Sequence, residues 1–369
     1  MKENKIEFFE LLRSGLWGSS IKPCLFNEKT DWNSIYDLSK KQAVLGIVLD
    51  GINRLPDNLK PPRLLYIKWC AEVIQIEDEN HKFNKEIINL FNLLKENGIS
   101  PILMKGQGLA SNYRNPLHRI SGDIDIFTGK QNYDKANKLL SLEGKALEKW
   151  SPIHMMFTWN KVVVENHRLI AKLSSPINNK KLNKLVDKWL QNQKLEEVEI
   201  EEYKTAIPPS DFDVMFILLH AVIHLLGFGV GLRQIIDWAM LLHSKKQKID
   251  HETVNSLLKK LGMITAARVF EVISVKYLGL PREDLIMPYS LYDEKLAEKI
   301  MADILYSGNF GYYGARKKRL PNKWLTKRIF NFFYRTKRAI RLTELAPAEA
   351  LWRPYRQISN FINLRLSKF

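Results

Sequence analysis

The chain has 369 residues, of which 45% are hydrophobic and 26% are charged. This composition is typical of soluble globular proteins, and the length suggests two or three structural units of roughly 150 residues each. The two cysteines, Cys24 and Cys70, exclude a disulfide framework and lack metal-ligand spacing, which fits a reducing, cytoplasmic compartment. The N-terminus mixes acidic and basic residues without an apolar stretch, so we expect no signal peptide.

The positive charge is concentrated in the C-terminal part. The net charge is +17, and residues 316–369 hold 15 lysines and arginines against two acidic residues, Glu344 and Glu349. This segment therefore has a local net charge of +13, and the rest of the chain has +4. So uneven a distribution predicts a tail with its own partner or its own docking surface.

The first 98 residues predict a helical region. Helix-compatible apolar spacing covers residues 39–52 and 63–82, and residues 85–96 place their apolar side chains on one face. Asn97 and Gly98 follow the last of these segments, as at many helix ends.

Residues 99–205 have a different pattern, in which short strands alternate with helices. Residues 100–104 form an apolar run of strand length, and residues 123–127 alternate polar with apolar side chains. A further helix is expected at 133–142, and further strands at 154–159 and 161–169. The predicted fold class is α+β, a small mixed sheet embedded in a largely helical protein.

Helices return in residues 206–310. The apolar stretch at 214–232 is long enough to raise the question of a membrane span. It contains His220 and His224, however, and histidines inside a span are costly, so we expect a buried helix. Residues 311–369 form the fourth segment, a basic amphipathic tail.

Asp123 and Asp125 are the residues most indicative of chemistry. In a strand, residues i and i+2 lie on one face, so the two carboxylates share a face while Ile124 and Ile126 bury the other. Such a pair offers hard oxygen ligands, which Mg²⁺ combines with water and nucleotide phosphates. An Asp-x-Asp strand without further context is also typical of a solvated face.

The turn before this strand favours a nucleotide site. Lys105, Gly106 and Gln107 follow the strand at 100–104, at a point where a helix can begin. Backbone N–H groups at a helix start bind phosphates, and Lys105 would add a positive charge. An ordinary turn also contains glycine, so its combination with Asp123 is more informative than either part.

These motifs resemble a known family. The similar residues are Met104-Lys105-Gly106, Tyr113, Arg119 and Gly122-Asp123-Ile124-Asp125-Ile126. They are similar to the signature of the uncharacterised nucleotidyltransferase family within the DNA polymerase beta superfamily. The resemblance implies transfer of a nucleoside monophosphate from a nucleoside triphosphate, with Mg²⁺ as cofactor. Gln107 stands where the superfamily has glycine or serine.

The resemblance also implies a third carboxylate. Glu165, followed closely by His167, matches an acidic residue that the family has on a neighbouring strand. It would act as general base for the acceptor hydroxyl, beside the metal ligands Asp123 and Asp125. The implied nucleotide-binding residues are Lys105, Gly106, Gln107 and Arg119. The alternatives are a surface glutamate at Glu165 and a structural Arg–Asp pair at Arg119.

The basic tail allows three interpretations. Large apolar residues recur there at roughly helical spacing among lysines and arginines, namely Trp324, Leu325, Ile329, Phe332 and Phe333. A basic amphipathic helix can lie on an anionic membrane surface or contact a nucleic-acid backbone. It can also pack its apolar side chains on the helical body, which we expect because such residues are seldom left in water.

Two classes of function follow. We expect an enzyme that transfers a nucleotide, from ATP or from CTP, GTP or UTP, to a small molecule, a saccharide, RNA or a protein. Toxin-like transfer to tRNA or protein is one form of this activity. The alternative is a catalytically inactive binding protein that associates with nucleic acid or a membrane surface through residues 316–369. In either case we expect a cytoplasmic protein, with peripheral membrane association as an option.

Overall fold

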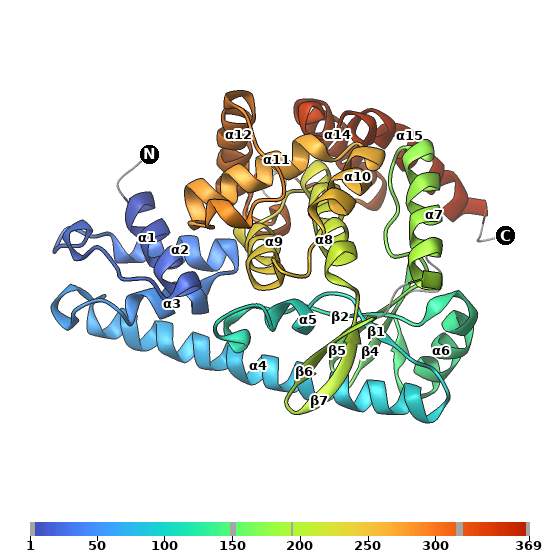
Figure 1. Cartoon of the computed structure of the whole chain (residues 1–369), viewed down its shortest axis with the longest axis horizontal. Coiled ribbons are helices and arrows are strands. Elements are labelled where there is room, and N and C mark those ends of the chain that lie inside the picture. The colour runs from blue at the N-terminus through green and yellow to red at the C-terminus, as the bar shows by residue number, and fades with distance from the viewer. Residues whose placement is uncertain (1–3, 148–152, 193–194, 315–319, 367–369) are drawn as a thin grey trace. The chain divides into compact units, whose positions relative to one another are not determined.

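A computed structural model describes the chain except for residues 1–3, 148–152, 193–194, 315–319 and 367–369 (Figure 1). The chain forms two compact units. The first consists of residues 1–170, 194–213 and 277–279, and the second of residues 171–193, 214–276 and 280–369.

The first unit begins with helices. Their bounds are α1 (Asn4–Trp17), α2 (Trp32–Gln42), α3 (Leu45–Ile52) and α4 (Arg63–Glu96). The single helix predicted at residues 39–52 is wrong, because Ala43 adopts a left-handed conformation with φ of 57° and separates α2 from α3. Such a conformation in a residue other than glycine has no signature in the apolar spacing.

Helix α4 joins two helices that were predicted separately. No glycine or proline lies between residues 63–82 and 85–96, so the backbone continues through Phe83 and Asn84 without a break. The predicted end at Asn97 is confirmed, and Gly98 follows in the left-handed region with φ of 71°.

A five-stranded mixed sheet follows, and it confirms the α+β class. Its strands are β1 (Ile102–Leu103), β2 (Ile124–Phe127), β3 (Lys145–Ala146), β4 (His154–Trp159) and β5 (Val162–His167). Their order is β1-β2-β5-β4-β3, in which β2 and β5 are parallel and the other neighbours are antiparallel. A two-stranded hairpin of β6 (Glu196–Ile200) and β7 (Tyr203–Ile207) was not predicted, although residues 197–200 alternate between acidic and apolar side chains.

One face of the sheet carries the core of this unit. Helices α4 and α6 (Gly129–Glu143) pack against it together with side chains of the hairpin. Representative members of this cluster are Phe91, Leu94, Ile124, Ile126, Leu140, Phe157, Val164 and Ile207. Because Ile124 and Ile126 point into the core, the alternation of the strand directs Asp125 to the opposite face, as predicted.

The second unit is helical. Its helices are α7 (Pro176–Asn192), α8 (Ser210–Gly227), α9 (Leu232–Lys245), α10 (His251–Leu261), α11 (Ile264–Ile273), α12 (Leu291–Ser307), α14 (Trp324–Arg341) and α15 (Pro347–Leu366), with the first four residues of α8 belonging to the first unit. Helix α8 is long and apolar enough to cross a membrane, but 78% of that stretch is buried inside the protein. The predicted buried helix is therefore confirmed.

The tail does not pack as predicted. Trp324, Leu325, Ile329 and Phe333 of α14 are 50–65% exposed, so the expected docking on the helical body is wrong for these four side chains, whereas Phe332 is half-buried. The tail is attached further along instead, through buried residues that include Arg338, Ala339, Leu342, Leu345 and Ala350. Apolar spacing identified the helix, but it could not show which of its faces is covered.

Candidate functional site

The parallel pairing of β2 with β5 brings the predicted carboxylates together. Asp125 and Glu165 are direct partners in the register of these strands, and Asp123 immediately precedes β2. Oxygen atoms of Asp123, Asp125 and Glu165 all lie within 4.8 Å of one another. The expectation that Glu165 lies on an adjacent strand within reach of both aspartates is therefore confirmed.

Asp125 is the most enclosed member of this group, with 1% of its surface exposed. Its Oδ1 accepts a hydrogen bond from Lys105 Nζ at 2.9 Å and another from His167 Nε2 at 2.7 Å. Burial favours the protonated carboxyl, but Lys105 and His167 together outweigh it and hold the pKa of Asp125 well below its ordinary value. Asp125 is therefore a carboxylate inside the protein.

The two basic partners of Asp125 are held in their charged forms. Burial alone would lower the pKa of Lys105, but the charges of Asp125 and Asp123 raise it above the ordinary value. Burial likewise opposes the charge on His167, and hydrogen bonds to Asp125 and Glu165 raise its pKa. Three acidic groups thus lie beside two basic ones, so the acidic groups exceed the basic ones by one.

The turn before β2 lies against the carboxylates. Gly106 has φ of 56° and ψ of −119°, a conformation that only glycine adopts without strain. A Cβ placed on Gly106 would lie 3.5 Å from the carbonyl oxygen of Asp123. Helix α5 (Gln107–Ala110) follows at once but has only four residues. The predicted anion site at a helix start therefore has the backbone N–H groups of a single helical turn.

Gln107 uses its side chain within the protein. Its Nε2 donates to Asn84 Oδ1 at 2.7 Å, and its Oε1 accepts from Ser121 Oγ at 2.9 Å. The side chain thereby joins α4 to the loop that leads into β2. A contact between Gln107 and a nucleotide would consequently involve its backbone.

Arg119 lies in the same network. It is 5% exposed, its Nη1 donates to Ser121 Oγ at 3.4 Å, and its carbonyl oxygen accepts from Asn80 Nδ2 at 3.0 Å. These contacts fix the loop before Asp123. The nucleotide-binding role of Arg119 stays a prediction.

His154 completes a second group for which the sequence indicated no role. It is the register partner of His167 across β4 and β5, and its Nδ1 lies 3.5 Å from Glu165 Oε2. The ligand atoms of His154, Glu165 and His167 also lie within 4.8 Å of one another, so these residues could hold a metal ion. Among the described residues, this set and the aspartate group are the two whose ligand atoms lie that close. Glu165 belongs to both sets.

The comparisons with known proteins agree with this geometry. The small mixed sheet carries three carboxylates on and beside neighbouring strands, and this group could hold a metal ion. Residues 28–276 match the model of the family described as uncharacterised nucleotidyltransferase, and the chain belongs to that family. No curated protein and no solved structure matches the chain.

Proposed function

We propose that this protein transfers a nucleoside monophosphate from a nucleoside triphosphate to an acceptor hydroxyl, with Asp123 and Asp125 holding a divalent cation and Glu165 acting as general base. The observation that carries the proposal is the Asp125–Glu165 pairing of parallel strands, which gathers three carboxylates within 4.8 Å. Oxygen donors in this number suit Mg²⁺, which takes its remaining ligands from water and phosphates. When bound, the cation supplies charge neutralisation for the triphosphate.

The residues of the chain would have distinct roles in this reaction. The acceptor oxygen forms a bond to the α-phosphorus, the bond between the α- and β-phosphates breaks, and pyrophosphate leaves. Glu165 receives the hydroxyl proton, since it is less enclosed than Asp125 and lies beside both His154 and His167. Asp125 is fixed by Lys105 and His167, so its orientation is set before substrate binds.

The charge of Lys105 would move from Asp125 to the substrate phosphates during the reaction. In the described structure its ammonium group neutralises Asp125 at 2.9 Å. A cation bound to the carboxylates would compete for the same oxygen, which would leave Lys105 available to the phosphates. The turn at Gly106 holds Lys105 next to Asp123 for either role.

The proposal is tested by incubating the protein with each labelled triphosphate, Mg²⁺ and a cell extract, and by identifying the labelled fraction. We expect labelled product and released pyrophosphate. Asp123→Asn and Glu165→Gln should each reduce the rate by ~10²-fold or more, as removal of a metal ligand or a general base does. Glu199→Gln, which changes an exposed carboxylate on the β6–β7 hairpin, is the matched control and should retain the wild-type rate.

The same experiment separates the enzyme from an inactive binding protein. An inactive binding protein would bind nucleotide and Mg²⁺ in calorimetry but would label no fraction of the extract with any triphosphate. Wild-type turnover by Asp123→Asn would remove the carboxylate site from the reaction altogether.

A further inference from the structure

Helix α14 leaves a continuous apolar stripe exposed. Leu325, Ile329, Phe333 and Ile340 are 52%, 50%, 65% and 64% exposed. Their spacing of four, four and seven residues places them on one helix face. Buried contacts of α14 lie elsewhere on its surface, at Arg338 and Ala339.

Helix α15 has a stripe of the same kind. Leu351, Tyr355, Ile358 and Ile362 are 68%, 60%, 49% and 50% exposed, at spacings of four, three and four residues. A single exposed apolar residue needs no explanation, but eight of them in two ordered rows exceed what a surface without a partner carries.

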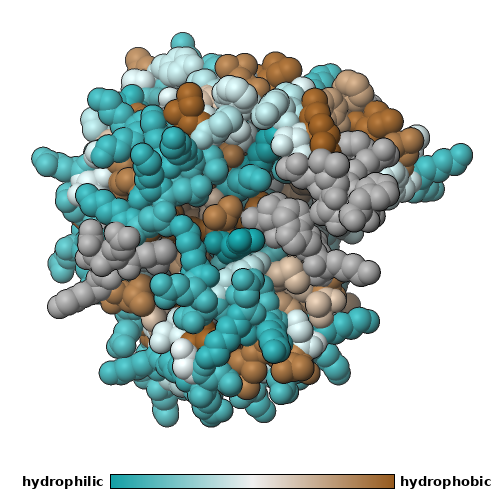
Figure 2. Space-filling view, turned by 90° about the vertical axis from the view of Figure 1, so that its right-hand side faces the viewer, coloured by the Kyte–Doolittle hydropathy of each residue, from teal (hydrophilic) through white to brown (hydrophobic). Residues whose placement is uncertain are grey.

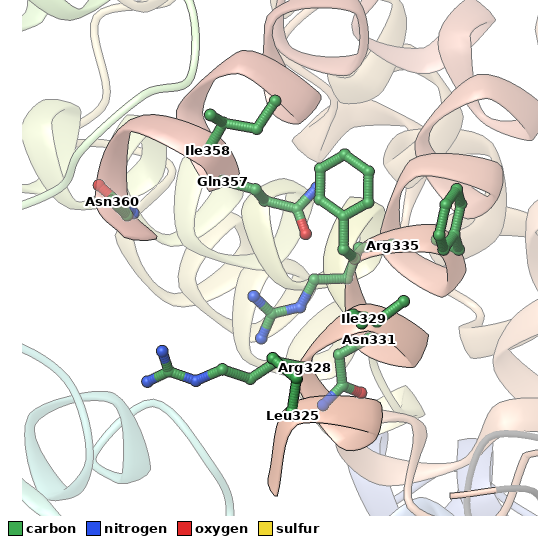
Figure 3. Close-up of a pocket in the computed structure, with 10 residues that line it drawn as sticks. Leu325, Arg328, Ile329, Asn331, Arg335, Gln357, Ile358 and Asn360 are labelled. Carbon is green, nitrogen blue, oxygen red and sulfur yellow. The ribbon is translucent and has the colours of Figure 1, made fainter. Parts of the chain in front are cut away.

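The two stripes meet at a groove of about 660 Å³ between the helices. Leu325, Ile329 and Phe333 line it from α14, and Ile358 lines it from α15 (Figure 3). The groove therefore joins three residues of the α14 stripe to one residue of the α15 stripe, with polar side chains between them. On the side of the molecule drawn in Figure 2, hydrophobic residues lie at the surface among hydrophilic ones.

Cationic side chains border this groove. Arg328 and Arg335 line the groove, and their guanidinium groups extend in the same direction there (Figure 3), while Lys327 and Lys337 are exposed elsewhere on α14. The Arg328 guanidinium also lies 4.3 Å from the centre of the exposed Trp324 ring. Apolar residues are thus flanked by cations and aromatic rings, an arrangement suited to the boundary between lipid headgroups and acyl chains.

Buried polar contacts hold both helices in place, so the stripes are a fixed feature of the second unit. Arg338 donates to both carboxylate oxygens of Asp303 on α12, one of them at 3.0 Å. The Glu349 carboxylate at the start of α15 accepts hydrogen bonds from the backbone N–H groups of Ser174 and Ser175. These contacts use the inner faces of the helices and leave the apolar rows exposed.

We propose that α14 and α15 bind the surface of an anionic phospholipid bilayer. The apolar rows would enter the headgroup region while the flanking lysines and arginines contact lipid phosphates. The local net charge of +13 favours an anionic bilayer over a second copy of the chain, because two such tails would repel each other. Nucleic acid would neutralise the charge but would leave the apolar rows in water.

The test is co-sedimentation of the full-length protein with vesicles of phosphatidylcholine, alone or mixed with phosphatidylglycerol. We expect binding to the mixed vesicles and much weaker binding to phosphatidylcholine alone. The variant Leu325→Ser/Ile329→Ser/Phe333→Ser should reduce the partition coefficient by roughly tenfold or more, because each removed side chain contributes to insertion. Raising salt should weaken the binding of the wild type by screening the cations.

The matched control is Leu64→Ser/Ile67→Ser, which alters exposed apolar residues of α4 in the first unit and should leave vesicle binding unchanged. Absence of wild-type binding to anionic vesicles would overturn the proposal, and so would equal binding by the triple variant. Salt-sensitive binding to RNA that the triple variant retains, without vesicle binding, would identify nucleic acid as the partner instead. Self-association that the triple variant abolishes, again without vesicle binding, would identify a second copy.

Discussion

Asp123 and Asp125 belong to one short motif, yet their side chains have different surroundings. Asp123 is half-buried and directly precedes β2, whereas Asp125 is enclosed and fixed by Lys105 and His167. A substitution at Asp123 therefore tests ligand binding, and a substitution at Asp125 also tests the stability of the fold.

We expect Asp125→Asn to lower the free energy of unfolding by ~3–5 kcal/mol, because it leaves Lys105 and His167 as buried cations without their carboxylate. Asp123→Asn should change it by less than ~1 kcal/mol, since Asp123 is only half-buried and water screens its charge. Urea denaturation of both variants measures the difference. Equal stabilities would show that the buried pair contributes little to folding.

A second buried carboxylate makes stability depend on pH. Burial raises the pKa of Glu271 to about 8, although the backbone N–H groups of Ile286 and Met287 donate to it at 2.6 and 3.3 Å. The folded state therefore keeps a proton that the unfolded state releases near 4.5.

The contribution of Glu271 to stability is fully present below about pH 4.5 and is lost as the pH rises toward about 8. The slope of this loss approaches ~1.4 kcal/mol per pH unit. We expect Glu271→Gln, which keeps the acceptor but cannot ionise, to flatten the profile over this range. Denaturation curves at several pH values test it, and an unchanged slope in the variant would assign the dependence to other groups.

At the scale of the element, the role of a sequence motif depends on its backbone conformation and on its exposure. The turn at Lys105-Gly106 is an example of the first, and helix α14 is an example of the second. The turn depends on a glycine in the left-handed region. The helix depends on which of its apolar residues are covered.

Gly106→Ala should cost ~1–3 kcal/mol of stability through backbone strain and should displace Lys105 from Asp125. Gly122→Ala, in the segment that leads into β2, is the control, because a Cβ there would meet nothing within 4 Å. Thermal or urea unfolding compares the two. A Gly106→Ala variant as stable as Gly122→Ala would mean that the turn can adopt another conformation.

In the tail, Leu342→Ala should cost ~2–5 kcal/mol because Leu342 is 1% exposed, whereas Leu325→Ala should remain within ~0.5 kcal/mol because Leu325 is 52% exposed. Both substitutions remove the same atoms, so their difference reports burial alone. Similar losses in melting temperature would show that Leu325 is covered in solution.

At the scale of the whole molecule, ligand binding should appear as a change in thermal stability. A nucleotide and Mg²⁺ that bind the folded protein stabilise it by about 2.7 kcal/mol at a hundredfold excess over the dissociation constant. We expect a rise in melting temperature with both ligands in the wild type and none in Asp123→Asn. An equal rise in that variant would place the nucleotide away from the carboxylates.

The sequence by itself determined the local features of this protein. Strict alternation at residues 123–127 set the faces of Asp125 and Ile126, and Asn97 and Gly98 marked the end of α4. These outcomes depend on neighbours in the chain, which is why periodicity could predict them. The division of the chain into four segments stays a prediction.

Only the tertiary structure decided which distant residues meet and which surfaces stay exposed. The parallel register that places Glu165 beside Asp125, and the arrival of His154 from the next strand, join residues that are far apart in the chain. Gln107 has a structural side chain because α4 passes beside it, and Leu325 is exposed because α14 is attached through Arg338 instead. Pairing and burial depend on packing between elements, and apolar periodicity carries no information about which neighbour an element will have.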